Sequence, residues 1–315
     1  MFDSYLKRLG ILGNNRRISQ YILPKNVRSD YPLVDDKIKT DLLMRQAGIP
    51  TPENYFTIQR MSDTRNLHPL LKNLEDFVVK PARGSMGNGI MIIEGINWSP
   101  DKRQTTLMAT RQKEISYSAF LYYISSILSG LYSLSGQPDR VLVQQRLRIH
   151  PFFKDISYQG IPDIRVIVVN GFPVMAMVRL PTETSGGRGN LHQGAVGCGI
   201  SLKDGKLIAA VQHNHMIDVH PDSKQTLVNL ELPCWKETLL LATKCSEMVR
   251  IGYLGVDIVI HPTQGPLLLE MNARPGLSIQ LANKAGLIPR LQHIDKLAPK
   301  NLSALERVEY SQSVF

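Results

Sequence analysis

The strongest constraint on the fold is the stretch GVDIVIHPTQGPLLLEMNARPG, which occupies residues 255–276. Two apolar runs flank a break rich in proline and glycine, a pattern typical of a β-hairpin. A turn centred on residues 263–264 places Asp257 opposite Glu270. Asn272 then shares the face of Glu270, because side chains alternate along a strand. The hairpin is therefore predicted to gather two carboxylates and one amide oxygen.

Two facing carboxylates repel each other unless something neutralises them. At about 4 Å and an effective dielectric of about 20, two like charges cost roughly 4 kcal/mol, whereas a favourable cross-strand pair returns only about 0.2–1 kcal/mol. Either one acid is protonated or a cation lies between them. Carboxylate and amide oxygens are hard ligands that suit Mg²⁺ or Mn²⁺ together with phosphate. Asp257, Glu270 and Asn272 are therefore candidate metal ligands, and the alternative is a solvated hairpin face whose acids are incidental.

Composition narrows the class of ligand. A chain of 315 residues can form one large or two to three small domains. Lysine and arginine number 37 against 27 acidic residues, and the net charge of +10 favours an anionic ligand or partner without choosing among nucleotide, phosphate, acidic peptide, nucleic acid and anionic membrane. Three scattered cysteines and an N-terminus without the apolar core of a signal peptide predict a cytoplasmic protein.

One uncharged segment, ISYSAFLYYISSILSGLYSL at residues 115–134, raises the question of a membrane span. Its serines lie largely opposite an apolar face, which favours a buried amphipathic helix over a transmembrane segment. A membrane-surface or partner-binding helix is the remaining alternative. The predicted apolar face consists of Phe120, Ile124, Ile127, Leu128 and Leu131.

The run KPARGSMGNGIMII at residues 80–93 is the second candidate site. An apolar strand ends in Lys80, a glycine-rich loop follows, and a second apolar strand resumes. Glycines let the backbone approach a ligand closely and turn its N–H groups toward a phosphate. The run lacks the Gly-Lys-[Ser/Thr] end of a Walker A loop, and no helix follows as in a dinucleotide fingerprint. It is interpreted as a lid over nucleotide phosphates, and the alternative is a plain glycine-rich hairpin.

The remaining segments are assigned by periodicity and punctuation. Residues 1–36 are polar and basic, typical of an arm or irregular cap. Helices are predicted at 35–47 and 235–251, and strands at 77–80, 140–147, 166–170 and 173–180, with a hairpin turn at Asn170-Gly171. The residues past Arg290 show no motif. A zinc site at His213, His215 and His220 is disfavoured, because no cysteine or carboxylate has supporting spacing.

The order of these parts resembles the ATP-grasp superfamily, and within it the RimK-like α-L-glutamate ligases. The resemblance covers roughly residues 35–290 and is most specific from DIRVIVV to RGNLHQG, over residues 163–194. It implies an α+β fold in which two antiparallel lobes hold ATP. The expected organisation is an arm at 1–36, an ATP-grasp domain at 37–290 with a glycine-loop lobe at about 77–143 and a metal-binding lobe at about 144–290, and a tail at 291–315.

The resemblance also implies a role for each matched residue. ATP contacts would come from Lys37, Lys80, Gly84, Ser85, Gly87, Gly89, Gln144, Gln145, Leu147 and Asp163. The transferred phosphoryl and acyl groups would be faced by Arg165, Arg179 and Asn190, with Arg274 beside the substrate pocket. Mg²⁺ would be held by Asp257, Glu270 and Asn272. Three departures stand out: a short N-terminal segment, Gln-Gln where Gln-Glu is common, and an arginine at 274 that suits either a second carboxylate or a structural salt bridge.

The chemistry implied is ligation. A carboxylate attacks the γ-phosphate of ATP to give an acyl phosphate and ADP, and an amine then displaces phosphate, so positive charge must be arranged in advance. The expected substrates are a carboxylate and an amine, with an amino acid or peptide acceptor, and a homo-oligomer stays open. The rival functions are a non-catalytic ATP sensor of the same fold and a nucleic-acid binder, the latter disfavoured by the dispersed charge.

Overall fold

The computed structural model describes residues 8–84, 87–110, 112–133, 136–297 and 301–315. It divides into two compact units. The smaller unit consists of Asp36–Ile38 and Pro52–Leu147, and the larger unit combines the described residues up to Asp35 with Lys39–Thr51 and Arg148–Phe315. These units extend beyond the lobes expected at 77–143 and 144–290. The strand at Asn54–Ile58 belongs to the smaller unit, and the C-terminal tail belongs to the larger one.

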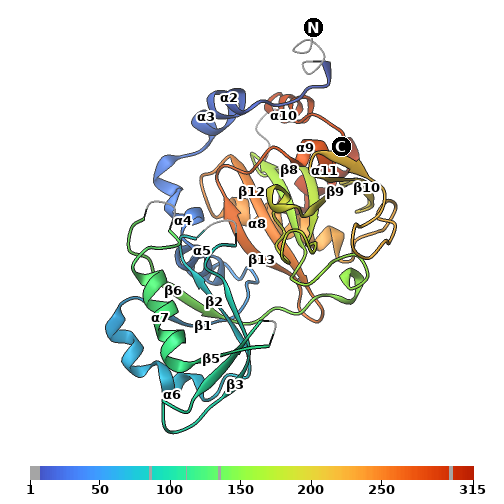
Figure 1. Cartoon of the computed structure of the whole chain (residues 1–315). Coiled ribbons are helices and arrows are strands. Elements are labelled where there is room, and N and C mark those ends of the chain that lie inside the picture. The colour runs from blue at the N-terminus through green and yellow to red at the C-terminus, as the bar shows by residue number, and fades with distance from the viewer. Residues whose placement is uncertain (1–7, 85–86, 111, 134–135, 298–300) are drawn as a thin grey trace. The chain divides into compact units, whose positions relative to one another are not determined.

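The smaller unit is built on a six-stranded sheet with the order β1-β6-β2-β3-β4-β5, in which every neighbouring pair is antiparallel. Figure 1 shows α6 and α7 beside these strands. Apolar side chains of both helices pack with those of the strands in one core. The elements are β1 (Asn54–Ile58), η3 (Met61–Asn66), α6 (Leu67–Leu71), β2 (Phe77–Pro81), β3 (Met91–Asn97), β4 (Thr106–Ala109), β5 (Lys113–Ser116), α7 (Tyr117–Leu128) and β6 (Val141–Gln144).

Helix α7 corrects the predicted helix at 115–134 at both ends. It begins after Ser116, whose hydroxyl accepts a hydrogen bond from the Ala119 amide at 3.2 Å, because the preceding residues belong to β5. It ends at Leu128, so Leu131 lies beyond the helix and is 68% exposed. The predicted apolar face is otherwise confirmed, since Phe120 and its helical neighbours are buried in the core.

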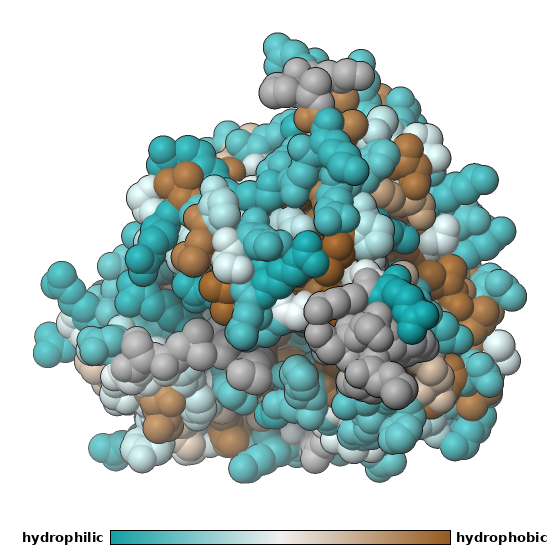
Figure 2. Space-filling model, turned by 90° about the horizontal axis from the view of Figure 1, so that it is seen from above, coloured by the Kyte–Doolittle hydropathy of each residue, from teal (hydrophilic) through white to brown (hydrophobic). Residues whose placement is uncertain are grey.

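No helix among the described residues has the length and apolar character that a membrane span requires. On the face seen in Figure 2, hydrophobic residues form small patches among hydrophilic ones. Within the described residues, the apolar segment of α7 is therefore accounted for by packing against its own sheet.

The larger unit contains a seven-stranded antiparallel sheet with the order β11-β10-β9-β8-β7-β12-β13. Helix α8 packs against one face of it, and α11 packs on α8. The strands are β7 (Asp163–Val169), β8 (Phe172–Leu180), β9 (Val196–Ile200), β10 (Leu207–Gln212), β11 (His215–Ile217), β12 (Tyr253–His261) and β13 (Gly265–Asn272). The helices after the arm are α5 (Lys37–Gln46), η4 (Pro151–Phe153), η5 (Leu191–Gln193), α8 (Trp235–Glu247), α9 (Ile279–Ala282), α10 (Ile288–Asp295) and α11 (Ala304–Val314).

The two faces of this sheet differ along β7. Its even-numbered residues enter the core under α8, whereas Ile167 and Val169 enter a second core formed with α9, α10 and the N-terminal arm. Asp163 and Arg165 share the face of Ile167 and Val169, because side chains alternate. They lie at the other end of the strand. One sheet face is thus apolar at one end and charged at the other.

The N-terminal arm is more ordered than the sequence predicted. It forms the short helices α2 (Asn14–Arg17), η1 (Ile18–Ile22), α3 (Leu23–Lys25), η2 (Arg28–Asp30) and α4 (Pro32–Asp35). Leu12, Tyr21 and Ile22 are buried in the second core. The tail is also helical, and α11 begins with a capping box between Ser303 and Glu306 that the sequence analysis overlooked.

In the hairpin of β12 and β13, Asp257 and Glu270 pair as predicted, but the pairing depends on a β-bulge that was not predicted. Pairs near the turn centre the hairpin on Thr263, so the predicted centre at 263–264 is wrong. A regular register from this turn would place Asp257 opposite Leu269. A β-bulge shifts the register there, and Asp257 faces Glu270 as predicted. The bulge inserts one residue and turns the acidic side chain of β13 onto the charged face.

Candidate functional site

A chain of ion pairs crosses the charged face of the larger unit. Arg165 donates from Nε and Nη2 to the two oxygens of Asp257, at 2.7 and 2.5 Å. Arg179 donates from Nη2 to Asp257 Oδ2 at 2.7 Å and from Nε to Asp163. Strand register explains this geometry, because Arg165 lies opposite Asp257 and Arg179 lies opposite Asp163. Three adjacent strands therefore hold both guanidinium groups in fixed positions.

Burial and charge shift the pKa values of these groups in opposite directions. Asp257 is fully buried, which by itself raises its pKa, but the charges and hydrogen bonds of Arg165 and Arg179 outweigh burial and hold the pKa at about 2. Burial raises the pKa of Asp163 to about 6, with Arg179 opposing and Asp257 reinforcing the rise. Burial lowers the pKa of Arg179, yet Asp163 and Asp257 keep it above its ordinary value. Asp257 is therefore a permanent anion, and Asp163 titrates near neutrality.

Glu270 and Asn272 extend the same face onto β13. Asn272 pairs with Gly255 two residues beyond the Asp257–Glu270 pair, so both side chains point to the charged side. Both residues are partly exposed, and Glu270 helps to raise the pKa of Arg179. The Asn272 side-chain oxygen accepts a hydrogen bond from the Arg274 amide at 2.8 Å. Three acids and two arginines thus share the face.

The three predicted metal ligands differ in whether their oxygens are available to a divalent cation. Glu270 and Asn272 present oxygen donors on a partly exposed strand end, which suits a hard cation. Both oxygens of Asp257 accept guanidinium hydrogen bonds, and the residue has no exposed surface. Within the described ranges, no cluster of three His, Cys, Asp or Glu side chains could hold a metal. In this structure, the cations that pair with Asp257 are Arg165 and Arg179.

The loop after β8 lies directly on this network. A Cβ added to Gly189 would stand 3.0 Å from Asp163 Oδ2 and 3.5 Å from the Cβ of Arg179, so glycine permits the close approach. Asn190 follows and caps η5, accepting a hydrogen bond from the His192 amide at 3.0 Å. The predicted residue Asn190 is therefore adjacent to the Asp163–Arg179 pair in the chain, with its side-chain oxygen used locally.

The smaller unit holds the predicted phosphate-binding residues. Lys37 opens α5 and donates from Nζ to the Gly84 carbonyl at 2.8 Å, which anchors the start of the glycine loop. Lys80 is buried near the end of β2. Gly87 and Gly89 have backbone φ angles of +72° and +71°, which residues with a side chain rarely adopt. Ser85, another predicted contact, lies outside the described residues.

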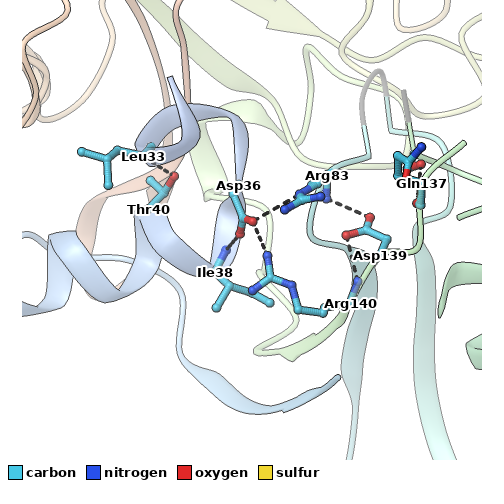
Figure 3. Close-up of polar contacts among 9 residues, drawn as sticks. Leu33, Asp36, Ile38, Thr40, Arg83, Gln137, Asp139 and Arg140 are labelled. Carbon is cyan, nitrogen blue, oxygen red and sulfur yellow. Dashed lines mark hydrogen bonds and ion pairs between the residues drawn. The ribbon is translucent and has the colours of Figure 1, made fainter. Parts of the chain in front are cut away.

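Two further arginines adjoin this loop and were missed by the sequence analysis. Figure 3 shows Arg83 and Arg140 converging on the carboxylate of Asp36. The Arg83 Nε lies 3.4 Å from Asp36 Oδ2, and Asp36 also accepts from the Ile38 amide at the start of α5. Asp139 accepts hydrogen bonds from the backbone amides of Arg83 and Arg140 at 2.9 and 2.8 Å. The sequence feature that could have pointed to Arg83 is its position directly before Gly84, the first glycine of the loop.

The predicted adenine contacts lie at the end of β6. Gln144 is buried in the sheet between Asn54 and Val78. Gln145 donates from its amide to the Glu53 carbonyl at 2.8 Å and accepts from the Glu53 amide at 3.2 Å. Leu147 is partly buried. Their role toward a nucleotide stays a prediction.

Comparison with known proteins identifies a family model and several named proteins that this chain resembles. The family model described as "Sugar-transfer associated ATP-grasp" matches residues 16–296. Proteins named probable alpha-L-glutamate ligase are similar: that of Marinomonas sp. (strain MWYL1) is 24% identical over 267 residues, covering 84% of this chain and 64% of the relative. That of Teredinibacter turnerae (strain ATCC 39867 / T7901) is 24% identical over 244 residues, covering 77% of this chain and 56% of the relative. The chain thus spans less than two thirds of these relatives.

Solved structures show a weaker likeness. The ATP-grasp ligase PsnB with its minimal precursor has 15% identity and a TM-score of 0.43, covering 86% of this chain and 62% of that one. The D-alanine–D-alanine ligase from Bacillus anthracis has 16% identity and a TM-score of 0.42, covering 89% and 68%. The family model matches most of the chain, and the predicted resemblance to the ATP-grasp superfamily is confirmed. The chain belongs to the sugar-transfer associated ATP-grasp family.

Proposed function

We propose that this protein is an ADP-forming ligase that uses ATP and Mg²⁺ to join a carboxylate to an amine. The observation that carries the proposal is the pair of arginines held by Asp257 on a face that ends in Glu270 and Asn272. The family match and the names of the similar glutamate ligases support it. The three cysteines, all unpaired, fit a reducing compartment, and we place the reaction in the cytoplasm.

The first step activates the carboxylate. Its oxygen attacks the γ-phosphorus of ATP, the bond from that phosphorus to the β–γ bridging oxygen breaks, and ADP leaves with the electron pair. Arg165 and Arg179 face the charge that gathers on the transferred phosphoryl group. Because Asp257 and Asp163 fix their positions beforehand, no reorganisation is needed as the charge develops. In the smaller unit, Lys37, Lys80 and the glycines at 84, 87 and 89 would hold nucleotide phosphates.

The second step forms the amide. The lone pair of the amine nitrogen attacks the acyl carbon, the bond to the phosphate oxygen breaks, phosphate leaves, and the nitrogen loses a proton to solvent. When bound, Mg²⁺ supplies charge neutralisation between neighbouring phosphate oxygens. Glu270 and Asn272 would hold it, and Asp257 would join them only by exchanging a guanidinium contact. We expect an amino acid or peptide as acceptor.

A second candidate is favoured by one observation. The Asp257 carboxylate is fully buried and engaged by two arginines, which suits a protein that binds ATP without ligating anything. The two functions differ in products. A sensor would bind ATP with no carboxylate-dependent release of ADP.

The test is trapping of the activated carboxylate. Purified protein, ATP, Mg²⁺ and hydroxylamine are incubated with a panel of amino acids and short acidic peptides. A ligase yields a hydroxamate together with ADP and phosphate, whereas AMP and pyrophosphate would exclude the proposed chemistry. Lys236→Gln, which removes a surface ion pair with Glu309, is the matched control and should react like the wild type.

A further inference from the structure

Arg274 differs from the other arginines near the proposed site in how it is held. Its guanidinium lies 4.9 Å from the centre of the Tyr31 ring, and the residue is exposed. Among the described residues, no carboxylate pairs with it, whereas Arg165 and Arg179 each bind aspartate. An aromatic ring orients a guanidinium without neutralising its charge. The planar group therefore keeps its capacity to bind an anion through paired N–H groups.

The N-terminal arm places Tyr31 beneath this arginine. Asp30, the preceding residue, is buried and accepts from Nη2 and the backbone amide of Arg250 at 2.7 and 2.8 Å. The Val27 amide also donates to the Arg250 carbonyl at 2.9 Å. These contacts fix the arm on both sides of residues 28–29. The ring position is thus set by the arm's attachment to the residues before β12.

The loop that carries Arg274 is fixed as well. Asn26 donates to the carbonyls of Tyr253 and Ala273, both at 3.1 Å, and Arg17 donates to the Pro275 carbonyl at 2.5 Å. The Arg274 amide itself bonds to the Asn272 side chain. The backbone that carries this exposed guanidinium is therefore fixed two residues beyond a proposed metal ligand.

We propose that Arg274, held against the ring of Tyr31, binds an anionic group of the amine substrate, distinct from the amine that reacts. This inference rests on the proposed ligase function and names the substrate class: an acidic molecule bearing a spare carboxylate or phosphate. Arg274 acts as the specificity-determining group and Tyr31 as its positioning residue. A carboxylate would come from an acidic amino acid or peptide, and a phosphate from a phosphorylated amine such as an amino sugar phosphate.

The first experiment measures charge preference in the ADP-release assay, with ATP and the carboxylate that forms a hydroxamate in the trapping test supplied. Two matched pairs of amines separate the sources: L-glutamate against L-glutamine, and glucosamine 6-phosphate against glucosamine. The wild type should prefer the charged member of one pair by at least about tenfold in kcat/KM, since a hydrogen bond to a charged group is worth that much or more. Arg274→Gln should collapse this ratio, mainly through KM. Tyr31→Leu should reduce it, and Tyr31→Phe should retain it, because the ring is kept.

Lys72→Gln is the matched control, because Lys72 also lies over an aromatic ring, 5.3 Å from the centre of Trp98, in the smaller unit. It should leave the ratio unchanged. A wild type without charge preference, or an Arg274→Gln variant that keeps the wild-type ratio, would overturn the proposal while leaving the ligase function intact.

A second measurement does not depend on turnover. Calorimetric titration of the nucleotide-free chain with glutarate and with inorganic phosphate should show binding of at least one probe that Arg274→Gln weakens about tenfold or more. If that binding is seen but no amine or carboxylate supports ADP release, the ligase function fails and the anion site stands. If the wild type binds neither probe, or the variant binds both equally well, the anion site is refuted.

Discussion

Each unit contains a buried aspartate that binds two arginines, and the two differ in their surroundings. Asp257 is wholly buried, and its arginines are themselves largely buried, with side-chain exposures of 11% and 13%. Asp36 is almost as buried, but Arg83 and Arg140 remain 49% and 26% exposed. Strand register positions the first cluster, whereas the start of a helix and a loop position the second.

The pairing within the two clusters also differs. Asp257 shares Arg179 with Asp163, so two acids and two arginines form one chain of ion pairs. In the other cluster, Arg83 and Arg140 meet at the carboxylate of Asp36, and their backbone amides donate to Asp139. The same motif of one aspartate between two arginines is thus part of a larger network in each unit.

The largest loss of unfolding free energy should come from substituting Asp257, the aspartate of the more buried cluster. Asp257→Asn leaves two buried guanidinium groups without their shared anion and should lower the unfolding free energy by about 3–5 kcal/mol. Asp36→Asn is the matched variant, and its cost should be about half as large, because water reaches Arg83 and Arg140. Urea unfolding of both variants measures the difference. Equal losses would show that burial does not distinguish the clusters.

A smaller effect is expected on nucleotide affinity. Arg83→Gln removes a partly exposed cation at the base of the glycine loop and should weaken ATP binding by about 1.5–3 kcal/mol, roughly tenfold or more in Kd, with little change for AMP. Calorimetric titration with ATP and AMP checks this, with Lys72→Gln as a control that should bind both normally. An equal loss for both nucleotides would indicate a general folding defect instead.

The pH dependence of the unfolding free energy distinguishes Asp163 from Asp257 within the buried cluster. The folded pKa of Asp163 is about 6, above an unfolded value of about 3.9, so the folded state holds more protons between these pH values. Its contribution to the unfolding free energy is therefore greatest below about pH 4 and is lost as pH rises toward 6. The folded pKa of Asp257, about 2, acts in the opposite sense and only below about pH 4.

Comparing wild type with Asp163→Asn isolates this contribution. Urea unfolding at pH 4.5 and pH 7 should show a difference of about 1–2 kcal/mol in the pH dependence of the two proteins, with the wild type losing stability more as pH rises. Identical pH profiles would mean that Asp163 stays ionised throughout. The result therefore reports whether Arg179 compensates Asp163 fully.

The smallest change in stability should follow Glu270→Gln. The substitution keeps the shape and the residue is partly exposed, so the unfolding free energy without metal should stay within about 0.5 kcal/mol. Turnover of Mg²⁺-ATP should nevertheless be almost abolished, because a charged ligand is lost. Thermal melts with and without Mg²⁺-nucleotide, together with ADP release, measure both. A variant that melts lower without metal yet turns over ATP normally would make Glu270 structural.

Local patterns accounted for much of the fold. The two apolar runs of residues 255–276 correctly predicted a hairpin in which Asp257 faces Glu270, whereas the strand predicted at 166–170 begins earlier, at Asp163. Helical spacing identified the buried face of α7. The helical prediction succeeds because the direction of a side chain in a helix follows the backbone period. The Asp257–Glu270 pairing also required a β-bulge, which the period does not predict.

The pairing of Arg165 and Arg179 with Asp257 was beyond the sequence, as were the bulge, the Asp36 cluster and the contact between Arg274 and the Tyr31 ring. Each depends on contacts between segments far apart in the chain: Arg165 and Asp257 are separated by 92 positions, and Asn26 is 247 positions from Ala273. Spacing within one segment carries no information about the register of another. The sequence by itself determined which residues share a face. Only the tertiary structure decided which charges meet, because ion pairing depends on distances of a few ångströms that long-range packing sets.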